Sequence, residues 1–457
     1  MSVMTRAKTS VMCAAVLMAM TACSTPQATQ KDALADAAST AGKPGARVEA
    51  NDSAEAAARA EGKHRAALAD AALNAHAIVF SATEAGVVSS VDYFSRLLAI
   101  DPYIMLEDKK FRGPRDLVIT AVGDVSQPTK KWSAATIALK GDVFLPTQHL
   151  LDSGDLVFMN LENPISEREP KVKKEFSFTS DPGRLDWYID AGFNLYSLSN
   201  NHIADAYQDG IDDTLRHLRE YSERKDATIF WAGAASTYEE AEAATWVTVE
   251  GKDLKIAFFS TGFSNGKNVS KFWSKTLVTK ITEAKKTADV VIVSVHAGKE
   301  YKHTPQAQLK TLYRGWVDAG ADVVIGHHPH VIRPVEAYKG GIILHSLGNY
   351  VFASRTRRHK EHGARMYGLV ARVIIRDGKP AGVELVPTWV NNAHGWKLES
   401  GEELPRADFV PRLVTGEFAD IFFEDFEQWT EEAGLTPSRR VRDAARVDAE
   451  APTGGEI

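Results

Sequence analysis

From Asp116 onward, short β-rich runs alternate with helical stretches, and no other feature of the sequence limits the fold as strongly. Such alternation is typical of an α/β layered domain, in which helices pack against a sheet. Two later runs, Tyr367–Ile375 and Val383–Val390, flank the turn Asp377-Gly378 and predict a β-hairpin. The eight earlier runs are Leu117–Val122, Leu156–Leu161, Leu195–Leu198, Thr228–Trp231, Ile256–Ser260, Val290–Val295, Val323–Ile325 and Ile342–His345.

One helix between two of these strands is well marked in the sequence. Thr304 is suited to cap it, Pro305 suits its first turn, and Gly320 is expected to end it. Its apolar residues recur at helical spacing and predict one buried face, which consists of Leu309, Leu312, Tyr313 and Trp316.

Composition excludes several other classes of protein. With 44% hydrophobic and 25% charged residues, the chain is neither collagen-like, nor a coiled coil, nor wholly disordered. The 54 Lys and Arg residues against 60 Asp and Glu give a formal net charge of -6, so no nucleic-acid partner is expected. The only cysteines are Cys13 and Cys23, so the body of the protein has neither a disulfide framework nor a cysteine zinc site.

The N-terminus has the features of an export signal. Basic residues precede the apolar run Val11–Met20, which is too short to span a bilayer. The run leads into Thr21-Ala22-Cys23, which resembles a bacterial lipobox and predicts lipid attachment at Cys23 after cleavage. An ordinary signal peptide, cut after a small residue, is the alternative. Ser24 after the cysteine resembles the outer-membrane sorting pattern, so we expect a lipid-anchored protein at the outer membrane, facing the periplasm.

The chain divides into six expected segments. The segment after the signal has hardly any bulky apolar side chain, so it cannot bury enough surface to offset the entropy of ordering. In order, we expect a lipoprotein signal peptide at residues 1–22, a lipid-anchored flexible tether at 23–75, an N-terminal helical extension at 76–115, the α/β domain at 116–392, a C-terminal extension at 393–436 and a disordered tail at 437–457.

Polar clusters follow several predicted strands directly, at the strand ends where α/β sheets collect their ligands. They are Gly123-Asp124, Asn160-Leu161-Glu162, Asn200-Asn201-His202, His296 and Gly326-His327-His328-Pro329-His330. Carboxylate, amide and imidazole groups in one pocket suit zinc, manganese or iron. The sequence therefore predicts a site for one or two divalent metal ions.

Each cluster also has a structural alternative. A lone histidine such as His296 is more often a hydrogen-bonded core residue, and Gly-Asp after a strand is commonly a turn. Asn201 can offer a metal its amide oxygen, or it can cap the helix that follows. Three histidines within four residues have few structural uses. If their segment is extended, His328 and His330 direct both rings into one pocket, while His202, on the opposite side of the backbone from Asn201, reaches substrate as a proton donor.

Six segments form an ordered series of motifs: Ala121–Val125, Asn160–Pro164, Ser199–His202, His296–Tyr301, Gly326–Val331 and Ser346–Phe352. In this order they resemble the motifs of the CapA family of capsule and poly-γ-glutamate synthesis proteins, over roughly residues 116–392. The resemblance implies a four-layer αββα metallophosphoesterase-like β-sandwich flanked by helices. It also implies a role in making, exporting or anchoring an anionic surface polymer.

The resemblance implies roles for individual residues as well. His202 takes the place of the general acid, and Asp205 matches a family acidic position beside it, although the glycine that normally follows closely is displaced to Gly210. Glu162 takes the place of the bridging carboxylate. The full set of implied metal ligands is Asp124, Glu162, Asn201, His296, His328 and His330.

The sequence departs from the family pattern at three places. Val125-Ser126 follows Asp124 where the broader superfamily has Asp-x-His, so one metal ligand is absent. Ala297 stands in place of the family's usual Trp, and His345 in place of its usual aromatic residue. These changes bear on whether one or two metal ions bind, and we expect them to widen the pocket.

Two functional hypotheses follow, and both place the protein in the bacterial cell envelope. In the first, the chain is a metal-dependent hydrolase or transferase that acts on a surface polymer or its phosphorylated precursor. In the second, the same site is a non-catalytic, metal-ordered pocket of an assembly factor that holds anionic polymer near export-machinery proteins. Basic residues would face the polymer in the second case, although a charge run is usually a solvated surface. These are Lys173, Lys174, Arg355, Arg357, Arg358 and Lys360.

Overall fold

The structure is a computed structural model that describes residues 113–128, 140–352, 367–390, 409–414 and 417–436. The expected signal peptide, tether and tail lie outside the described residues, as do the expected helical extension up to residue 112 and the basic residues of 353–366. Within the described part of the chain, no helix is long and apolar enough to cross a membrane.

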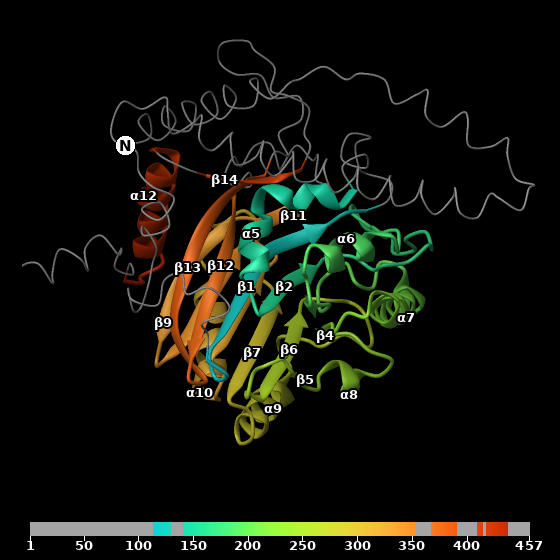
Figure 1. Cartoon of the computed structure of the whole chain (residues 1–457), viewed down its shortest axis with the longest axis horizontal. Coiled ribbons are helices and arrows are strands. Elements are labelled where there is room, and N and C mark those ends of the chain that lie inside the picture. The colour runs from blue at the N-terminus through green and yellow to red at the C-terminus, as the bar shows by residue number, and fades with distance from the viewer. Residues whose placement is uncertain (1–112, 129–139, 353–366, 391–408, 415–416, 437–457) are drawn as a thin grey trace, which may run out of the picture. The chain divides into compact units, whose positions relative to one another are not determined.

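The first sheet contains eight strands in the order β14-β13-β12-β1-β2-β3-β4, with β11 also paired to β1. Figure 1 shows β13, β12, β1 and β2 side by side in this order. Strands β1 to β4 are parallel, whereas β12 and β13 form an antiparallel hairpin. The bounds are β1 Leu117–Ser126, β2 Leu156–Leu161, β3 Leu195–Ser197, β4 Phe230–Ala232, β11 Asn349–Phe352, β12 Tyr367–Arg376, β13 Lys379–Val390 and β14 Pro411–Leu413.

The second sheet contains six strands in the order β5-β6-β7-β8-β10-β9. Its central strands β6, β7, β8 and β10 are parallel, and the edge strands β5 and β9 are antiparallel to their neighbours. The bounds are β5 Thr245–Val247, β6 Ile256–Gly262, β7 Val290–His296, β8 Val323–His327, β9 Ile332–Tyr338 and β10 Gly341–Leu347. All eight strands predicted from the alternating runs are therefore present, and so is the predicted hairpin.

The two sheets pack on each other, and helices cover both outer faces. Between the sheets, Phe158 of β2 meets Phe258 of β6 with ring centroids 6.1 Å apart, and both side chains are fully buried. The outer face of the first sheet packs against a 3-10 helix at Lys140–Thr147 and against α5 Gln148–Asp152, α6 Arg184–Asp190 and α7 Tyr207–Lys225. The outer face of the second sheet packs against α9 Lys275–Lys285 and α10 Ala307–Asp318. The expected four-layer α/β architecture is confirmed.

The marked helix between β7 and β8 is present, but its start was predicted wrongly. Helix α10 begins at Ala307, and its N-cap residue is Gln306, whose φ of -62° and ψ of 140° keep the chain extended there. Thr304 and Pro305 therefore precede the helix, and no side chain caps it. The buried face agrees with the prediction, because Tyr313 and Trp316 are almost fully buried. Gly320 follows the last turn with a φ of 115°, which favours glycine.

The C-terminal part adds to the folded body beyond the hairpin. Strand β14 pairs with β13 at the edge of the first sheet. Helix α12, Glu417–Glu432, contributes Phe422, Phe423 and Phe426 to the core between the sheets. One remaining short helix is α8, Tyr238–Ala241, which begins with a capping box between Thr237 and Glu240.

Candidate metal centre

The candidate site lies where the carboxyl ends of strands from both sheets meet. Strands β1 and β2 end near Asp124 and Glu162, and strands β7 and β8 of the other sheet end at His296 and His327. Contacts cross from one sheet to the other: the backbone N–H of His328 donates to Asp124 Oδ2 over 3.2 Å. Five of the polar clusters predicted from separate strand ends are therefore brought to one place.

Asp124 occupies an irregular point of β1. The register shifts on both sides of it, and its backbone N–H donates to Gly348 O over 2.9 Å. The chains approach closely here, because a Cβ on Gly123 would lie only 2.3 Å from Gly348 O. Local glycine therefore lets β1 leave the regular ladder and direct the Asp124 carboxylate into the site.

The Asp124 side chain is fully buried among polar groups. Asn160 Nδ2 donates to its Oδ1 over 2.9 Å, His330 Nδ1 lies 3.2 Å from Oδ2, and His327 Nδ1 lies 3.1 Å from Oδ1. Burial alone raises the pKa of Asp124, but the neighbouring His327 and His330 outweigh burial and hold the pKa well below its usual value.

Glu162 is also fully buried, and its surroundings act in the opposite direction. Burial and, next, the negative charge of Asp124 raise the pKa of Glu162 well above its usual value. Its Oε1 atom accepts no hydrogen bond from any described residue. The nearest ring nitrogens are His330 Nε2 at 3.7 Å and His296 Nε2 at 3.8 Å. An unsatisfied carboxylate oxygen thus faces two imidazoles.

His296 and Asn201 meet directly. His296 Nε2 lies 2.9 Å from Asn201 Oδ1, and His328 Nδ1 lies 3.1 Å from the same His296 nitrogen. Burial lowers the pKa of His296 well below its usual value, and the neighbouring His328 adds to this effect. The same cause, burial, lowers the pKa of His328 to about 4. Both rings are therefore neutral near pH 7, which is the state that offers a free nitrogen to a metal ion.

The histidine pair reaches the site by a backbone path that differs from the expected one. The predicted convergence of the two rings was conditional on an extended segment, but His328 has a φ of 91° and His330 a φ of 54°. Left-handed backbone at two non-glycine residues is uncommon and is found at constrained functional sites. The two rings still converge, with centroids 5.9 Å apart, and His330 Nδ1 donates to Asn349 Oδ1 over 3.0 Å.

His202 and Asp205 form a hydrogen-bonded pair. His202 Nδ1 donates to Asp205 Oδ2 over 2.8 Å, and Asp205 also accepts from the Phe178 backbone N–H at 2.7 Å and pairs with Lys174 Nζ at 2.6 Å. The Phe178 ring lies 4.8 Å from the His202 ring, and burial lowers the pKa of His202 despite the bond to Asp205. Lys174 is therefore engaged inside the site, and its Nζ also donates to Asn201 O over 2.7 Å.

The capping alternative applies to Asn200 rather than to Asn201. Asn200 Oδ1 accepts from the backbone N–H groups of His202 at 3.0 Å and Ile203 at 2.8 Å. This local turn leaves Asn201 to face His296. Two of the residues expected to widen the pocket, Ala297 and His345, make their contacts elsewhere. Ala297 belongs to the core beneath the second sheet's helices, and His345 bonds to Glu336 Oε2 at 3.1 Å.

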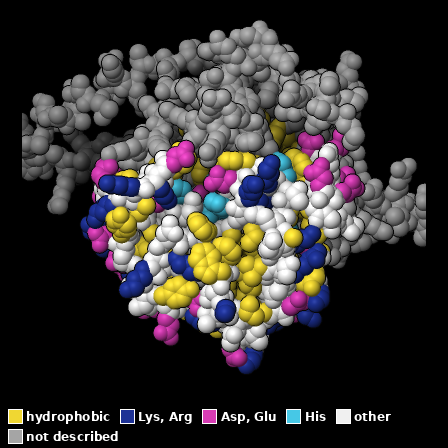
Figure 2. Space-filling model, turned by 180° about the vertical axis from the view of Figure 1, so that it is seen from behind, with side chains coloured by type: hydrophobic (Ala, Val, Ile, Leu, Met, Phe, Trp, Pro, Cys, Tyr) yellow, Lys and Arg dark blue, Asp and Glu magenta, His cyan; other side chains and the backbone are white. Residues whose placement is uncertain are grey.

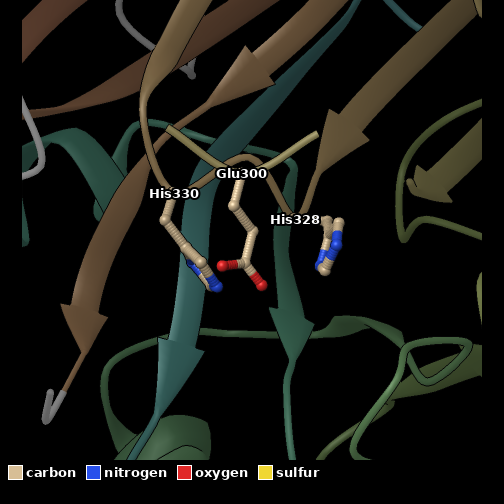
Figure 3. Close-up of side chains that lie close together, drawn as sticks. All are labelled: Glu300, His328 and His330. Carbon is tan, nitrogen blue, oxygen red and sulfur yellow. The ribbon is translucent and has the colours of Figure 1, made fainter. Parts of the chain in front are cut away.

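Two groups of three residues each could hold a metal ion. Within each group, the three donor atoms all lie within 4.8 Å of one another. The deeper group is Asp124, Glu162 and His330. The outer group is Glu300, His328 and His330, and Figure 3 shows the Glu300 carboxylate between the two rings. Sequence reasoning gave no role to Glu300, Asn160 or Asn349, although all three lie within the quoted motifs. The one sequence signal for these three residues was that each lies in a motif beside a residue to which a role was assigned.

The surface around this centre is mixed in character. Figure 2 shows histidine side chains beside acidic and basic ones, next to a hydrophobic area. An exposed aromatic pair borders the centre: the Phe263 backbone N–H donates to His296 O over 2.8 Å, and the Phe263 ring lies 6.0 Å from that of Trp273. A ligand at the centre would therefore meet both charged and aromatic groups.

A four-layer α/β sandwich with carboxylates and histidines at its strand ends is consistent with the metallophosphoesterase-like class of fold. The sequence model of one family, described as "Bacterial capsule synthesis protein PGA_cap", matches residues 118–354, which is more than half of the chain. The chain belongs to this family.

Relatives with curated names support that membership. "Capsule biosynthesis protein CapA" of Bacillus anthracis is 29% identical over 61% of this chain and 68% of its own length. "PGA biosynthesis protein CapA" of Bacillus subtilis is 28% identical over 57% of this chain and 74% of its own length. A solved structure, a hypothetical protein from Thermus thermophilus, matches 59% of this chain and 98% of its own with 17% identity and a TM-score of 0.38, a likeness too weak to support a conclusion.

Proposed function

We propose that this protein acts in making, exporting or anchoring an anionic surface polymer of the capsule or poly-γ-glutamate type. Within that role, the centre described above is a metal-dependent hydrolase or transferase site for the polymer or its phosphorylated precursor. Family membership and the names of the Bacillus relatives support the general role. The geometry of the buried carboxylates supports the chemistry.

One observation carries the metal assignment: Glu162 Oε1 is buried and accepts no hydrogen bond from the described residues. A buried carboxylate oxygen without a partner is costly, and a bound cation removes that cost. The oxygen lies beside a second buried carboxylate, Asp124, and within 3.8 Å of two imidazole nitrogens. This mixture of oxygen and nitrogen donors suits manganese, zinc or iron.

The residues that would hold one or two such ions are those the family resemblance implies: Asp124, Glu162, Asn201, His296, His328 and His330. A bound divalent cation withdraws charge from the attacked centre and makes water or a polymer end more nucleophilic. The donor set fits this assignment, because Asn201 Oδ1 and His296 Nε2 are in direct contact at 2.9 Å and face the same space as Glu162.

His202 is the proposed general acid, and Asp205 is its positioning partner. Asp205 accepts a hydrogen bond from Nδ1–H of His202. The opposite ring nitrogen, Nε2, is therefore the one available to a substrate. Among the described residues none bonds to His202 Nε2. The Phe178 ring beside His202 and the Lys174 ion pair with Asp205 hold the pair in place. When the His202 ring is protonated at both nitrogens, Nε2–H can give its proton to a leaving group while Nδ1–H stays bonded to Asp205.

Attachment to the membrane is proposed from the sequence alone. The lipobox-like Thr21-Ala22-Cys23 supports a lipid on Cys23, a cell-envelope location and, with Ser24, the periplasmic face of the outer membrane. Polymer and export-machinery proteins would be the partners there. The expected signal peptide and the lipid-anchored tether fall within residues 1–112, outside the described part of the chain.

Metal analysis of the purified protein, joined to an activity screen, tests the proposal. The screen offers phosphoesters, γ-glutamyl peptides and polysaccharides. The double variant His328→Ala/His330→Ala should lose bound cation and turnover, while a change at the exposed His149 of α5, His149→Ala, should keep both. Equal cation content in the wild type and the double variant would exclude the assignment of these two ligands.

The same variants separate the hydrolase from the assembly factor. His202→Ala should keep the cation but stop polymer production if the site is catalytic. A strain that carries His202→Ala and makes normal polymer with normal cation content would instead favour the non-catalytic, metal-ordered pocket. In that case His328→Ala should still abolish polymer, because it loosens the pocket itself.

A further inference from the structure

Glu300 is an acidic side chain at the mouth of the centre that the roles above leave unused. It is the most exposed member of the outer donor group, and its carboxylate faces the rings of His328 and His330 (Figure 3). Among the described residues it accepts no hydrogen bond and forms no ion pair. A carboxylate held between two imidazoles, with no Lys or Arg paired to it, has the environment of a cation ligand.

A buried arginine holds the loop that carries Glu300. Arg333 of β9 is fully buried, and it donates from Nε to Lys302 O at 2.8 Å and from Nη2 to Lys299 O at 2.9 Å. The Tyr301 backbone N–H donates to Pro329 O over 2.9 Å, which joins this loop to the turn between His328 and His330. The positions of all three outer donors are thus fixed by one connected set of backbone contacts.

Gly298 makes the close approach of this loop to Arg333 possible. Its φ is 128°, in the region that favours glycine, and a Cβ there would lie 2.7 Å from Arg333 Nη1. Any other residue would push the loop away from the arginine. The position of Glu300 therefore depends on a glycine whose backbone conformation other residues rarely adopt and on a buried arginine.

The outer group also compensates for a ligand that the first motif lacks. Where the broader superfamily has a histidine, this chain has Ser126, whose hydroxyl donates to Asn163 Oδ1 over 3.0 Å and not to the centre. Val125 is buried in the core under the helices of the first sheet. Asp124 is therefore the only donor that β1 provides, and a second ion needs a donor from elsewhere.

We propose that Glu300 is the ligand that completes an outer cation position with His328 and His330. This inference rests on the proposed metal-dependent function. His330 belongs to both groups, and Asp124, Glu162, Asn201 and His296 are the other residues of the deeper position. The three donor atoms of the outer group all lie within 4.8 Å of one another, so one ion could contact all of them.

Counting bound Mn²⁺ tests this without an activity assay. The full protein is stripped with a chelator and dialysed against Mn²⁺, and bound metal is counted by elemental analysis while free Mn²⁺ is followed by electron paramagnetic resonance. Glu300→Gln removes the carboxylate charge and keeps the shape. The matched control is Glu250→Gln, the same change at an exposed turn far along the chain from both donor groups.

We expect the wild type and Glu250→Gln to bind about two Mn²⁺ per chain and Glu300→Gln about one, or to bind the second ion at least about tenfold more weakly. Two ions bound equally well by Glu300→Gln would overturn the role of Glu300 while leaving the deeper site intact. A wild type that binds one ion, unchanged in Glu300→Gln, would also overturn the outer position. A wild type that binds no Mn²⁺, Zn²⁺ or Fe²⁺ would overturn the proposed function itself.

Discussion

His303 links the acid stability of the protein to the docking of its C-terminal helix. Its ring stacks on Trp429 of α12 at 3.7 Å with an interplanar angle of 13°, and its Nδ1 donates to Ile332 O over 2.7 Å. Burial, helped by the positive charge of Arg333, lowers the pKa of His303 to about 4. The folded protein therefore holds this histidine neutral under conditions where the unfolded chain protonates it.

The magnitude follows from the two pKa values. The unfolded value of 6.5 and the folded value of about 4 differ by about 2.5, which corresponds to about 3.4 kcal/mol at about 1.36 kcal/mol per pKa unit. Between these two pH values the unfolded state binds more protons than the folded state. The contribution of His303 to the free energy of unfolding is therefore fully present above pH 6.5 and falls as the pH drops towards 4. At pH 5.5 the loss due to His303 alone is about 1.4 kcal/mol.

Urea unfolding at pH 7.5 and pH 5.5, followed by tryptophan fluorescence, measures this contribution. His303→Gln keeps a donor for Ile332 O but cannot take up a proton, so its loss of stability between the two pH values should be smaller than that of the wild type by about 1.4 kcal/mol. His149→Gln, at the exposed histidine of α5, is the control and should behave as the wild type does. If His303→Gln and the wild type lose the same amount, the reasoning about this ring is refuted.

Three further predictions concern the anchor and the centre. Cys23→Ala should release the protein from membranes without changing its thermal unfolding, and membrane retention of that variant would argue for another attachment. Asp205→Asn should keep the bound cation but lower turnover by about 10²–10⁴, because the charged carboxylate that accepts the hydrogen bond from His202 Nδ1 becomes a neutral amide. Unchanged turnover on the substrate found by the screen would contradict this. Gly298→Ala should cost about 1–3 kcal/mol of stability and weaken the second Mn²⁺, since its Cβ meets Arg333; full stability with normal Mn²⁺ binding would show that the loop tolerates the clash.

Most of the strands were predictable because each is a short, largely apolar run that is buried on both faces. Leu156–Leu161 is an example, with six consecutive buried residues and bounds that agree with the prediction. The hairpin was predictable for a different reason. Asp377 and Gly378 both adopt positive φ, of 49° and 73°, which is what a two-residue turn between twisted strands requires.

Backbone detail at loops was not predictable in the same way. Thr304 and Pro305 have the chemistry of a helix start, yet α10 begins only after Gln306, whose backbone is extended with a ψ of 140°. The left-handed backbone at His328 and His330 has no sequence signal either, since neither residue is glycine. Contacts with residues far along the chain, among them Asp124 and Asn349, hold that conformation.

Asn160 shows why the centre depends on both sheets. Its Nδ2 lies 2.9 Å from Asp124 Oδ1, 3.4 Å from Glu162 Oε2 and 3.0 Å from His296 Nδ1, so one amide group meets three polar side chains. The two carboxylates come from the first sheet and the imidazole from the second. Because Asn160 engages Nδ1 of His296, Nε2 is the nitrogen that faces Asn201 Oδ1 and Glu162 Oε1. One amide thereby fixes the orientation of the His296 ring between the sheets, and the register of β2 against β1 is what puts that amide there.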